Sequence, residues 1–296
     1  MLDPRGPRAL VDYELRRLPA FVTDVLVVGS GVAGLTAALE AARGRDVLVI
    51  AKGSILETNT ACAQGGIAAV LGADDSVASH RDDTLSVGQG LCEADVVETV
   101  TSRGPEAVRR LVSLGAHFDR LPDGTFDLSR EGGHSRPRVV HAQGDLTGPT
   151  IESALAARVR SHPRIGVFEH TFVIDLITDD AGACVGALAW RRDSGLLVLG
   201  APRTILATGG AGQLYRETTN PEIATADGVA MAFRAGAAVR DAEFVQFHPT
   251  TLYVAGAARL LISEVVRGKG AVLVDRTGTP FLRDYHPDGD LAPRDV

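Results

Sequence analysis

A short glycine-rich segment most constrains what this chain can fold into. Residues 29–34 read G-S-G-V-A-G, and they directly follow an apolar run at 24–28. Residues 31–43 then carry apolar side chains at helical spacing, and 46–51 form a second apolar run typical of a buried parallel strand. This order predicts a βαβ unit whose loop amides and helix N-terminus bind the pyrophosphate of a dinucleotide.

The loop and the strand that follows it narrow the choice of dinucleotide. We expect six loop residues to bind the cofactor: Gly29, Ser30, Gly31, Val32, Ala33 and Gly34. Lys52 ends the second strand, where many such folds carry an acid for the ribose hydroxyls. A lysine cannot accept a hydrogen bond from a hydroxyl, so this position weighs against NAD.

The rest of the chain predicts an α/β protein with two domains. Helical patterns and turn-separated apolar runs alternate along it. We expect helices at 93–114, 149–159 and 227–234, an irregular stretch at 52–90, an antiparallel β-meander at 166–206 and a buried strand at 204–207. The fold class is therefore a Rossmann-like domain with a parallel sheet and an antiparallel β-meander, plus the start of an α+β capping domain. The expected limits are 1–20 for a frayed tail, 21–245 for the cofactor-binding domain and 246–296 for the capping domain.

Composition excludes several classes of partner. The net charge of −7 argues against nucleic acid or an anionic membrane as the main partner. No apolar run approaches the roughly 18 residues of a membrane span, and the first 20 residues lack the apolar core of a signal peptide. The three cysteines fit no metal-ligand spacing and suggest a reducing compartment. We therefore expect a cytoplasmic protein that binds no metal.

Several further motifs, in order along the chain, resemble one known family. The segments are 29–34, A-Q-G-G-I-A at 63–68, A-T-G-G at 207–210, Q-F-H-P-T at 246–250, S-E-V-V-R-G-K-G at 263–270 and L-A-P-R-D-V at 291–296. They resemble the flavoprotein family of succinate dehydrogenase, fumarate reductase and L-aspartate oxidase. The resemblance implies FAD as cofactor and a four-carbon dicarboxylate as substrate.

The resemblance also implies which residues contact FAD. Lys52 matches a lysine near the cofactor, and a longer segment would line the flavin: Asn59, Thr60, Ala61, Cys62, Ala63, Gln64, Gly65 and Gly66. Val173 and Asp227 would lie near the adenosine half or its flanking loops. Val173 could equally be an ordinary strand residue, and Asp227 could simply cap a helix.

Two positions discriminate among the members of this family. Succinate dehydrogenases carry a histidine that bonds covalently to FAD where this chain has Asn59, so we expect noncovalent FAD. Glu131 lies in R-E-G-G-H-S, an element that resembles the aspartate-oxidising members. An ammonium removed from water needs an anionic partner, and L-aspartate differs from succinate by such a group. Without the family, Glu131 would read as a solvated loop carboxylate.

The remaining site residues suit a dianionic substrate. By resemblance, His248 and Ser263 bind substrate carboxylates, although family members usually carry threonine at the second position. Glu264 and Arg267 share a face if their segment is helical, and the resemblance implies that they relay protons to the catalytic Arg294. Without the family, Glu264 and Arg267 would be a surface ion pair worth less than about 1 kcal/mol.

The expected reaction is therefore oxidation of L-aspartate to iminoaspartate, with oxygen or fumarate as electron acceptor, at the start of quinolinate and NAD synthesis. A functional link to quinolinate synthase follows from that role. Two alternatives stay open: a soluble fumarate reductase, and an FAD-binding fragment without activity. The second arises because the family's other substrate-binding histidine and arginine have no counterpart in these 296 residues.

Overall fold

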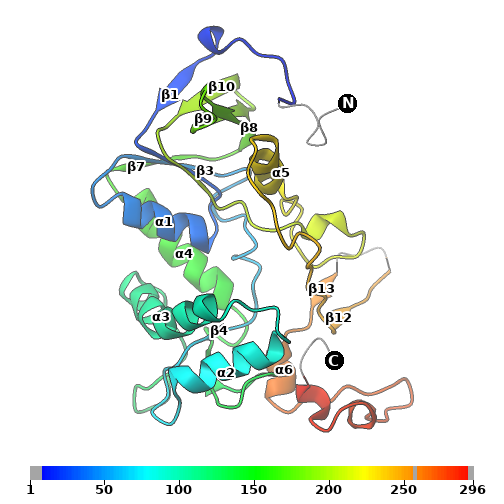
Figure 1. Ribbon diagram of the computed structural model, residues 1–296. Helices are drawn as coiled ribbons and strands as arrows, with labels where there is room; N and C mark the ends of the chain where they lie inside the picture. The colour runs from blue at the N-terminus through cyan, green and yellow to red at the C-terminus, as the bar shows by residue number, and fades with distance from the viewer. Residues whose placement is uncertain (1–8, 256–258, 293–296) are drawn as a thin grey trace. The chain divides into compact units, whose positions relative to one another are not determined.

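The computed structural model describes residues 9–255 and 259–292 (Figure 1). The chain divides into two compact units. Unit 1 comprises residues 1–62 and 152–245, and unit 2 comprises residues 63–151 and 246–296. The domain limits expected from the sequence, 21–245 and 246–296, stay a prediction, because a compact unit and a functional domain are different divisions of a chain.

A four-stranded parallel sheet forms the base of unit 1. Its strands lie in the order β11-β2-β3-β7 and all run parallel. Their bounds are Val25–Val28 for β2, Val47–Ile50 for β3, Ile165–Phe168 for β7 and Thr204–Leu206 for β11. Every residue of β2 and β3 is buried, as expected of central strands covered on both faces. The predicted βαβ unit is thus confirmed, with helix α1 (Val32–Ala41) between its strands.

The predicted β-meander is confirmed for three strands and wrong for the first of its apolar runs. Strands β8 (Thr171–Thr178), β9 (Cys184–Arg191) and β10 (Gly195–Gly200) are antiparallel neighbours. Residues 166–168, expected at the start of the meander, instead belong to β7, which pairs in parallel with β3. A single apolar run shows burial but not strand direction, which depends on a distant partner.

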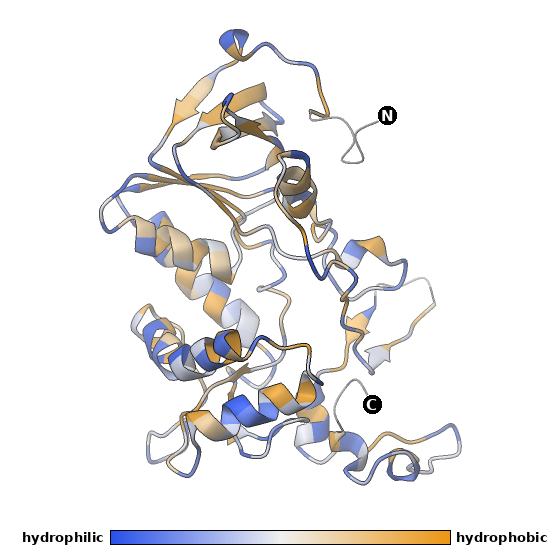
Figure 2. Ribbon diagram, viewed as in Figure 1, coloured by the Kyte–Doolittle hydropathy of each residue, from blue (hydrophilic) through white to orange (hydrophobic). Residues whose placement is uncertain are grey.

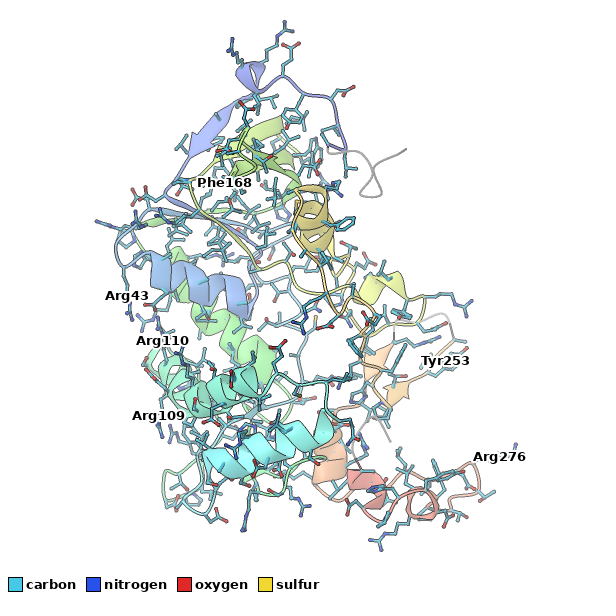
Figure 3. The ribbon with its side chains drawn as sticks, in the orientation of Figure 1. Arg43, Arg109, Arg110, Phe168, Tyr253 and Arg276 are labelled. Carbon is cyan, nitrogen blue, oxygen red and sulfur yellow. The ribbon has the colours of Figure 1, made fainter. Side chains whose placement is uncertain are left out.

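The core of unit 1 contains apolar residues from both of its sheets. It includes Leu26 and Ile50 from the parallel sheet, Leu199 from the meander, and Met231 from α5 (Asp227–Arg234). Figure 2 shows these strands predominantly in the apolar colour. Phe168, which Figure 3 labels, lies at the end of β7. Its ring packs edge-on against Phe21, with ring centroids 5.0 Å apart.

The N-terminal segment carries more structure than the expected frayed tail. Residues 1–8 lie outside the described residues, but residues 9–20 include η1 (Leu15–Arg17) and the first residue of strand β1 (Ala20–Val22). Strand β1 pairs in parallel with β10, and the Leu10 amide donates a hydrogen bond to Asp175.

Unit 2 contains small sheets and two substantial helices. One sheet has the order β4-β6-β5 and another pairs β12 with β13. The bounds are Ile67–Ala68 for β4, Leu128–Ser129 for β5, Val139–Val140 for β6, Thr251–Leu252 for β12 and Leu260–Leu261 for β13. Short helical segments follow: α6 at Glu264–Gly268, η3 at Leu282–Asp284 and η4 at Gly289–Leu291. Helix α4 (Thr147–Arg160) begins in unit 2, and its residues from Glu152 onward belong to unit 1.

One helix of unit 2 was predicted and the other was not. Helix α3 (Ala94–Ser113) confirms the expectation for 93–114, with Pro105 inside it, and the side chains of Arg109 and Arg110 point outward (Figure 3). Helix α2 (Val77–Val87) lies in the stretch expected to be irregular. Its one buried residue is His80, so the segment lacks the apolar periodicity that predicts a helix. Over the described ranges, no helix combines the length and the apolar character needed to cross a bilayer.

Candidate functional site: a dinucleotide cavity and a cluster of acid and histidine residues

The glycine loop in unit 1 is built by close backbone approaches. Gly29 has φ +112°, and a Cβ there would lie 2.1 Å from the carbonyl oxygen of Ala207. A Cβ on Gly34 would lie 2.0 Å from the carbonyl oxygen of Gly29, so only glycine lets α1 pack onto the loop. These contacts support the predicted roles of both residues.

The loop leads directly into the N-terminus of α1. Gly31 is the N-cap residue, so the first amides of a ten-residue helix follow it. The amide of Val32 donates a hydrogen bond of 3.0 Å to Thr60 Oγ1. Thr60, another predicted cofactor contact, therefore lies at this end of the helix. The positive end of the helix dipole at this terminus suits an anionic phosphate.

A cavity of about 600 Å³ opens in unit 1 beside the loop. That volume lies within the range of small-molecule sites. Several predicted cofactor residues line it: Gly29, Ser30, Gly31, Val32, Ala33, Lys52, Asn59, Thr60, Val173 and Asp227. Gly34 lies beneath the loop, Ala61 and Cys62 are not among the lining residues, and residues 63–66 belong to unit 2.

Lys52 and Asp227 form one polar wall of this cavity. Lys52 Nζ lies 2.7 Å from Asp227 Oδ2 and donates a second hydrogen bond of 2.7 Å to Thr225 Oγ1. The sequence argument noted that Lys52 cannot accept a hydroxyl hydrogen bond. The structure adds the missing acceptor, because Lys52 holds the carboxylate of Asp227 at the cavity wall.

Some lining residues were not among the predicted contacts. They include Glu57, Thr58, Thr171, Phe172, Leu206, Thr208, Gly209 and Ala224, with further residues of α5 and the segment after it. Thr208 and Gly209 follow β11, and they lie at the same carboxyl edge of the parallel sheet as the glycine loop after β2. Ligands of open parallel sheets bind at this edge, so the A-T-G-G motif after a predicted strand was the signal that could have found them.

The A-Q-G-G segment has a packing role inside unit 2. A Cβ on Gly66 would lie 2.5 Å from the Val140 carbonyl oxygen and 2.7 Å from the His141 ring. Gly66 therefore lets the chain pass close against β6. The role of Ala63, Gln64, Gly65 and Gly66 as cofactor contacts stays a prediction.

In unit 2, Glu131 lies in a buried polar group. Its side chain is 14% exposed, and its Oε1 lies 3.4 Å from Nε2 of His141. The same Nε2 lies 2.6 Å from Ser129 Oγ. Burial, together with the positive charge of Lys269, lowers the pKa of His141. Glu131 is thus not a solvated loop carboxylate, and sequence reasoning missed His141 and Ser129.

The loop that carries Glu131 is fixed to α2 by a charged cluster, which we call the Arg138 clamp. Its members are Asp75, Ser79, Asp83, Ser135 and Arg138. Arg138 is fully buried and donates two hydrogen bonds to Asp75, of 2.9 and 2.8 Å, and one to Asp83. Asp83 accepts hydrogen bonds of 2.8 Å from the amide and the hydroxyl of Ser135.

The charges of this clamp stay ionised because they satisfy one another. Burial alone would raise the pKa of Asp75, but hydrogen bonds from Arg138 hold it below its usual range. For Asp83, hydrogen bonds from Ser135 and Arg138 likewise overcome burial and lower the pKa. A buried ion pair of this kind is costly to break, because removing one partner leaves an uncompensated charge.

The predicted carboxylate-binding residues of unit 2 are held by local hydrogen bonds. His248 Nδ1 lies 2.9 Å from the carbonyl oxygen of Thr250, and Thr250 Oγ1 donates to the Ile262 carbonyl. Ser263 is buried and caps α6, where its Oγ accepts a hydrogen bond of 3.3 Å from the Val265 amide. A hydroxyl that accepts at a helix cap keeps its own proton for donation.

Glu264 and Arg267 form an ion pair, as their spacing on a helix predicted. Arg267 Nη2 lies 2.6 Å from Glu264 Oε1, and the two side chains are only 10% and 13% exposed. The reading as a weak surface pair is therefore wrong, because both charges are largely removed from water. Arg267 also donates to the Asp290 carbonyl oxygen. The fifth predicted residue, Arg294, lies outside the described residues.

The loop that carries Glu131 packs against α6 and against residues 291–292. A Cβ on Gly268 would lie 3.2 Å from the carbonyl oxygen of Arg130, and one on Gly132 would lie 3.1 Å from the carbonyl oxygens of Leu291 and Ala292. Unit 2 therefore brings Glu131 close to α6 and to the backbone two residues before Arg294. Within the described residues, no group of three metal-ligating side chains is present.

Comparisons with known proteins show which proteins the chain is similar to. Two L-aspartate oxidases are similar to the chain. The one from Streptomyces coelicolor is 47% identical over 285 residues, an alignment that covers 94% of this chain and 49% of the relative. The one from Mycobacterium tuberculosis is 50% identical over 279 residues, covering 92% and 52%. The chain thus spans about half the length of the curated relatives it matches.

Solved structures show the same fold. A variant of E. coli quinol fumarate reductase matches with a TM-score of 0.87 and 35% identity, covering 94% of this chain and 49% of that one. A flavocytochrome c3 fumarate reductase matches with a TM-score of 0.75 and 32% identity, covering 92% and 51%. Residues 24–296 match the sequence family described as FAD binding domain. With its glycine loop and dinucleotide cavity, the chain therefore belongs to the FAD binding domain family.

Proposed function

We propose that the protein is an FAD-dependent L-aspartate oxidase, which converts L-aspartate to iminoaspartate with oxygen or fumarate as electron acceptor. The observation that carries this proposal is the largely buried carboxylate of Glu131 beside His141. A substrate ammonium removed from water needs such an anion, whereas succinate and fumarate, which carry only negative charges, would be repelled by it. The likeness to L-aspartate oxidases supports the same substrate.

The cavity of unit 1 fits FAD. Side chains on Gly29 or Gly34 would collide with the neighbouring backbone, and the amides of α1 suit the pyrophosphate. We assign Lys52 and Asp227 to the ribose or adenosine region, and Val173 beside them. Residues 59–66 are proposed for the flavin half. When bound, FAD supplies the acceptor for the hydride that leaves the substrate Cα.

The substrate roles are assigned to unit 2. Glu131 binds the α-ammonium, while His248 and Ser263 donate hydrogen bonds to carboxylate oxygens. Arg294 holds a carboxylate by charge. The buried pair of Glu264 and Arg267 serves as its proton relay, since two largely desolvated groups 2.6 Å apart can exchange a proton directly.

FAD is proposed to bind noncovalently. Asn59 stands where covalent relatives carry a histidine, and its amide donates a hydrogen bond of 2.6 Å to Asn220. Acid precipitation should therefore leave the yellow cofactor in the supernatant, and retention of flavin fluorescence in the denatured protein band would contradict this.

The proposed product indicates a partner enzyme, and the cysteines indicate a compartment. Iminoaspartate hydrolyses readily, so we propose a functional link to an enzyme that consumes it in quinolinate synthesis. The three cysteines are free thiols, which supports a cytoplasmic, reducing location.

The decisive experiment measures two activities of the purified, FAD-loaded protein. We expect hydrogen peroxide to form when L-aspartate is added under air, and succinate to form when fumarate replaces oxygen. The proposal is wrong if L-aspartate fails to bleach the flavin absorbance while fumarate is reduced by an artificial donor.

That second outcome defines the alternative, a fumarate reductase. It is favoured by the TM-score of 0.87 to quinol fumarate reductase. Because the chain spans about half the length of its relatives, a third outcome concerns these 296 residues alone. If they bind FAD but show neither activity, they act as an FAD-binding part of a longer catalytic assembly.

A further inference from the structure

Strand pairing brings Ser129 and His141 to one face. In the antiparallel pair β5–β6, Ser129 lies opposite Val139 and Leu128 opposite Val140. His141 therefore stands diagonally across from Ser129, two positions beyond its direct partner, and such diagonal neighbours share a face. Glu131 lies in the loop after β5, and its Oε1 comes within 3.4 Å of His141 Nε2.

Both contacts of the imidazole fall on the same ring nitrogen. Ser129 Oγ lies 2.6 Å and Glu131 Oε1 lies 3.4 Å from His141 Nε2. In a nucleophilic triad the acid binds Nδ1 while the hydroxyl binds Nε2, so this cluster is not an activated serine. His141 Nδ1 is buried and has no hydrogen-bond partner in the described residues.

This geometry selects a tautomer. An N–H at Nδ1 would be a buried donor without an acceptor, and a lone pair at Nε2 would face the Glu131 carboxylate. Placing the proton on Nε2 removes both costs, because Nε2–H then donates toward Ser129 and presents its positive end to Glu131. The ring stays uncharged, so His141 itself does not neutralise the Glu131 carboxylate.

The surroundings keep the ring neutral. Lys269, which follows α6, opposes a positive charge on His141, while Asp119 and Asp127 act more weakly in the other direction. Burial and Lys269 together lower the pKa of His141, so a neutral imidazole persists at physiological pH.

We propose that His141 is a positioning residue for amine recognition: as a neutral Nε2–H donor it orients the Glu131 carboxylate without neutralising it, and so makes the site select an amino dicarboxylate over a plain one. This inference rests on the proposed function. A positively charged residue at position 141 would instead cancel the charge that attracts the substrate ammonium.

The test compares two dicarboxylates that differ by the amine. For L-aspartate, the dissociation constant of the FAD-loaded protein is taken from the concentration dependence of flavin reduction in anaerobic rapid mixing, and for succinate it is read from flavin absorbance changes at equilibrium. In His141→Phe, which removes the Nε2–H group, L-aspartate binding should weaken by about tenfold, equal to about 1.4 kcal/mol, because the positive end of that group no longer faces the Glu131 carboxylate. Succinate binding should change by less than about twofold.

Two further variants keep the test falsifiable if His141→Phe folds poorly beside Gly66. His141→Gln retains an N–H donor and should restore L-aspartate affinity to within about threefold of wild type. His141→Lys should weaken L-aspartate binding and leave succinate binding unchanged or tighter. Steady-state kinetics should place the His141→Phe defect in KM for L-aspartate rather than in kcat.

Two results would overturn the inference. One is an equal loss of L-aspartate and succinate binding in His141→Phe and His141→Gln, which indicates a merely structural residue. The other is unchanged L-aspartate binding in His141→Phe. If the wild-type protein binds succinate but not L-aspartate, the proposed function fails, and this inference fails with it.

Discussion

At the scale of single residues, the glycine loop was predictable because its glycines, strand and helix follow one another in sequence. A Cβ on Gly34 would meet the carbonyl oxygen of Gly29 within the same motif, whereas the contact that Gly29 makes with distant Ala207 could not be predicted. His141 was not predictable, because its importance depends on pairing between β5 and β6 and on Ser129 across that pair. The sequence around a histidine does not indicate which distant residues lie on the same face of a sheet.

Replacing Gly34 with alanine should damage the loop. Its Cβ would lie 2.0 Å from the Gly29 carbonyl oxygen, so α1 must move, at a cost of about 1–3 kcal/mol. We expect a lower urea midpoint and at least tenfold weaker FAD binding, measured by fluorescence. Gly44→Ala is the matched control, because a Cβ at Gly44 meets no atom within 4 Å. Equal behaviour of the two variants would contradict the packing argument.

Replacing Glu131 with glutamine should change substrate preference. The amide keeps the shape but removes the charge that binds the ammonium, so kcat/KM for L-aspartate should fall by about 100-fold or more, corresponding to roughly 3 kcal/mol. Fumarate reduction with an artificial donor should fall by less than about fivefold. Parallel losses in both reactions would remove Glu131 from amine recognition.

At the scale of elements, helix α2 shows what apolar periodicity does not detect. Helix α2 is instead held by Ser79 and Asp83, two members of the Arg138 clamp that lie on one face of the helix. Both accept hydrogen bonds from Arg138. The partner that orders this helix is therefore a buried guanidinium more than 50 residues away in sequence. The prediction for β7 was wrong for the same reason, because its partner strand β3 is also distant in sequence.

The clamp predicts that Asp83 matters and that its neighbour does not. Asp83→Asn removes a charge beside the buried Arg138 and weakens two hydrogen bonds from Ser135, so unfolding free energy should fall by about 2–3 kcal/mol. Asp82→Asn should cost less than about 0.5 kcal/mol, because its pair with Arg81 is exposed to solvent. Chemical denaturation of both variants measures the difference, and similar losses would exclude a specific clamp.

At the scale of the whole molecule, stability should depend on a buried acid that the sequence did not single out. Glu152 on α4 is fully buried, and in the described residues neither oxygen has a hydrogen-bond partner of good geometry. Burial raises the pKa of Glu152 to about 7, and the neighbouring Thr58 hydroxyl offsets this only in part. Sequence gave no signal, since an acid at a helical position is ordinarily solvent-facing.

The sign of the pH effect follows from the raised pKa. The folded state favours the protonated acid, so this contribution is fully present below the unfolded pKa of 4.5 and is lost as pH rises through about 7. The difference in unfolding free energy between wild type and Glu152→Gln should therefore shift by about 2–3 kcal/mol between pH 5 and pH 8, with the wild type losing stability. Glu243→Gln, at an exposed position, should show no such shift. A constant difference across this range would disprove the assignment.

Strand β1 has a consequence for the behaviour of the protein in concentrated solution. Its three residues lie along β10, whose backbone would otherwise present unpaired amides and carbonyls beside the apolar side chains of residues 196–199. An uncovered edge of that kind recruits a strand from another molecule. Deleting residues 1–22 should therefore cause self-association visible by light scattering, whereas deleting residues 1–8 leaves every described pairing intact and should not. A monodisperse protein after the longer deletion would show that β1 is no guard against aggregation.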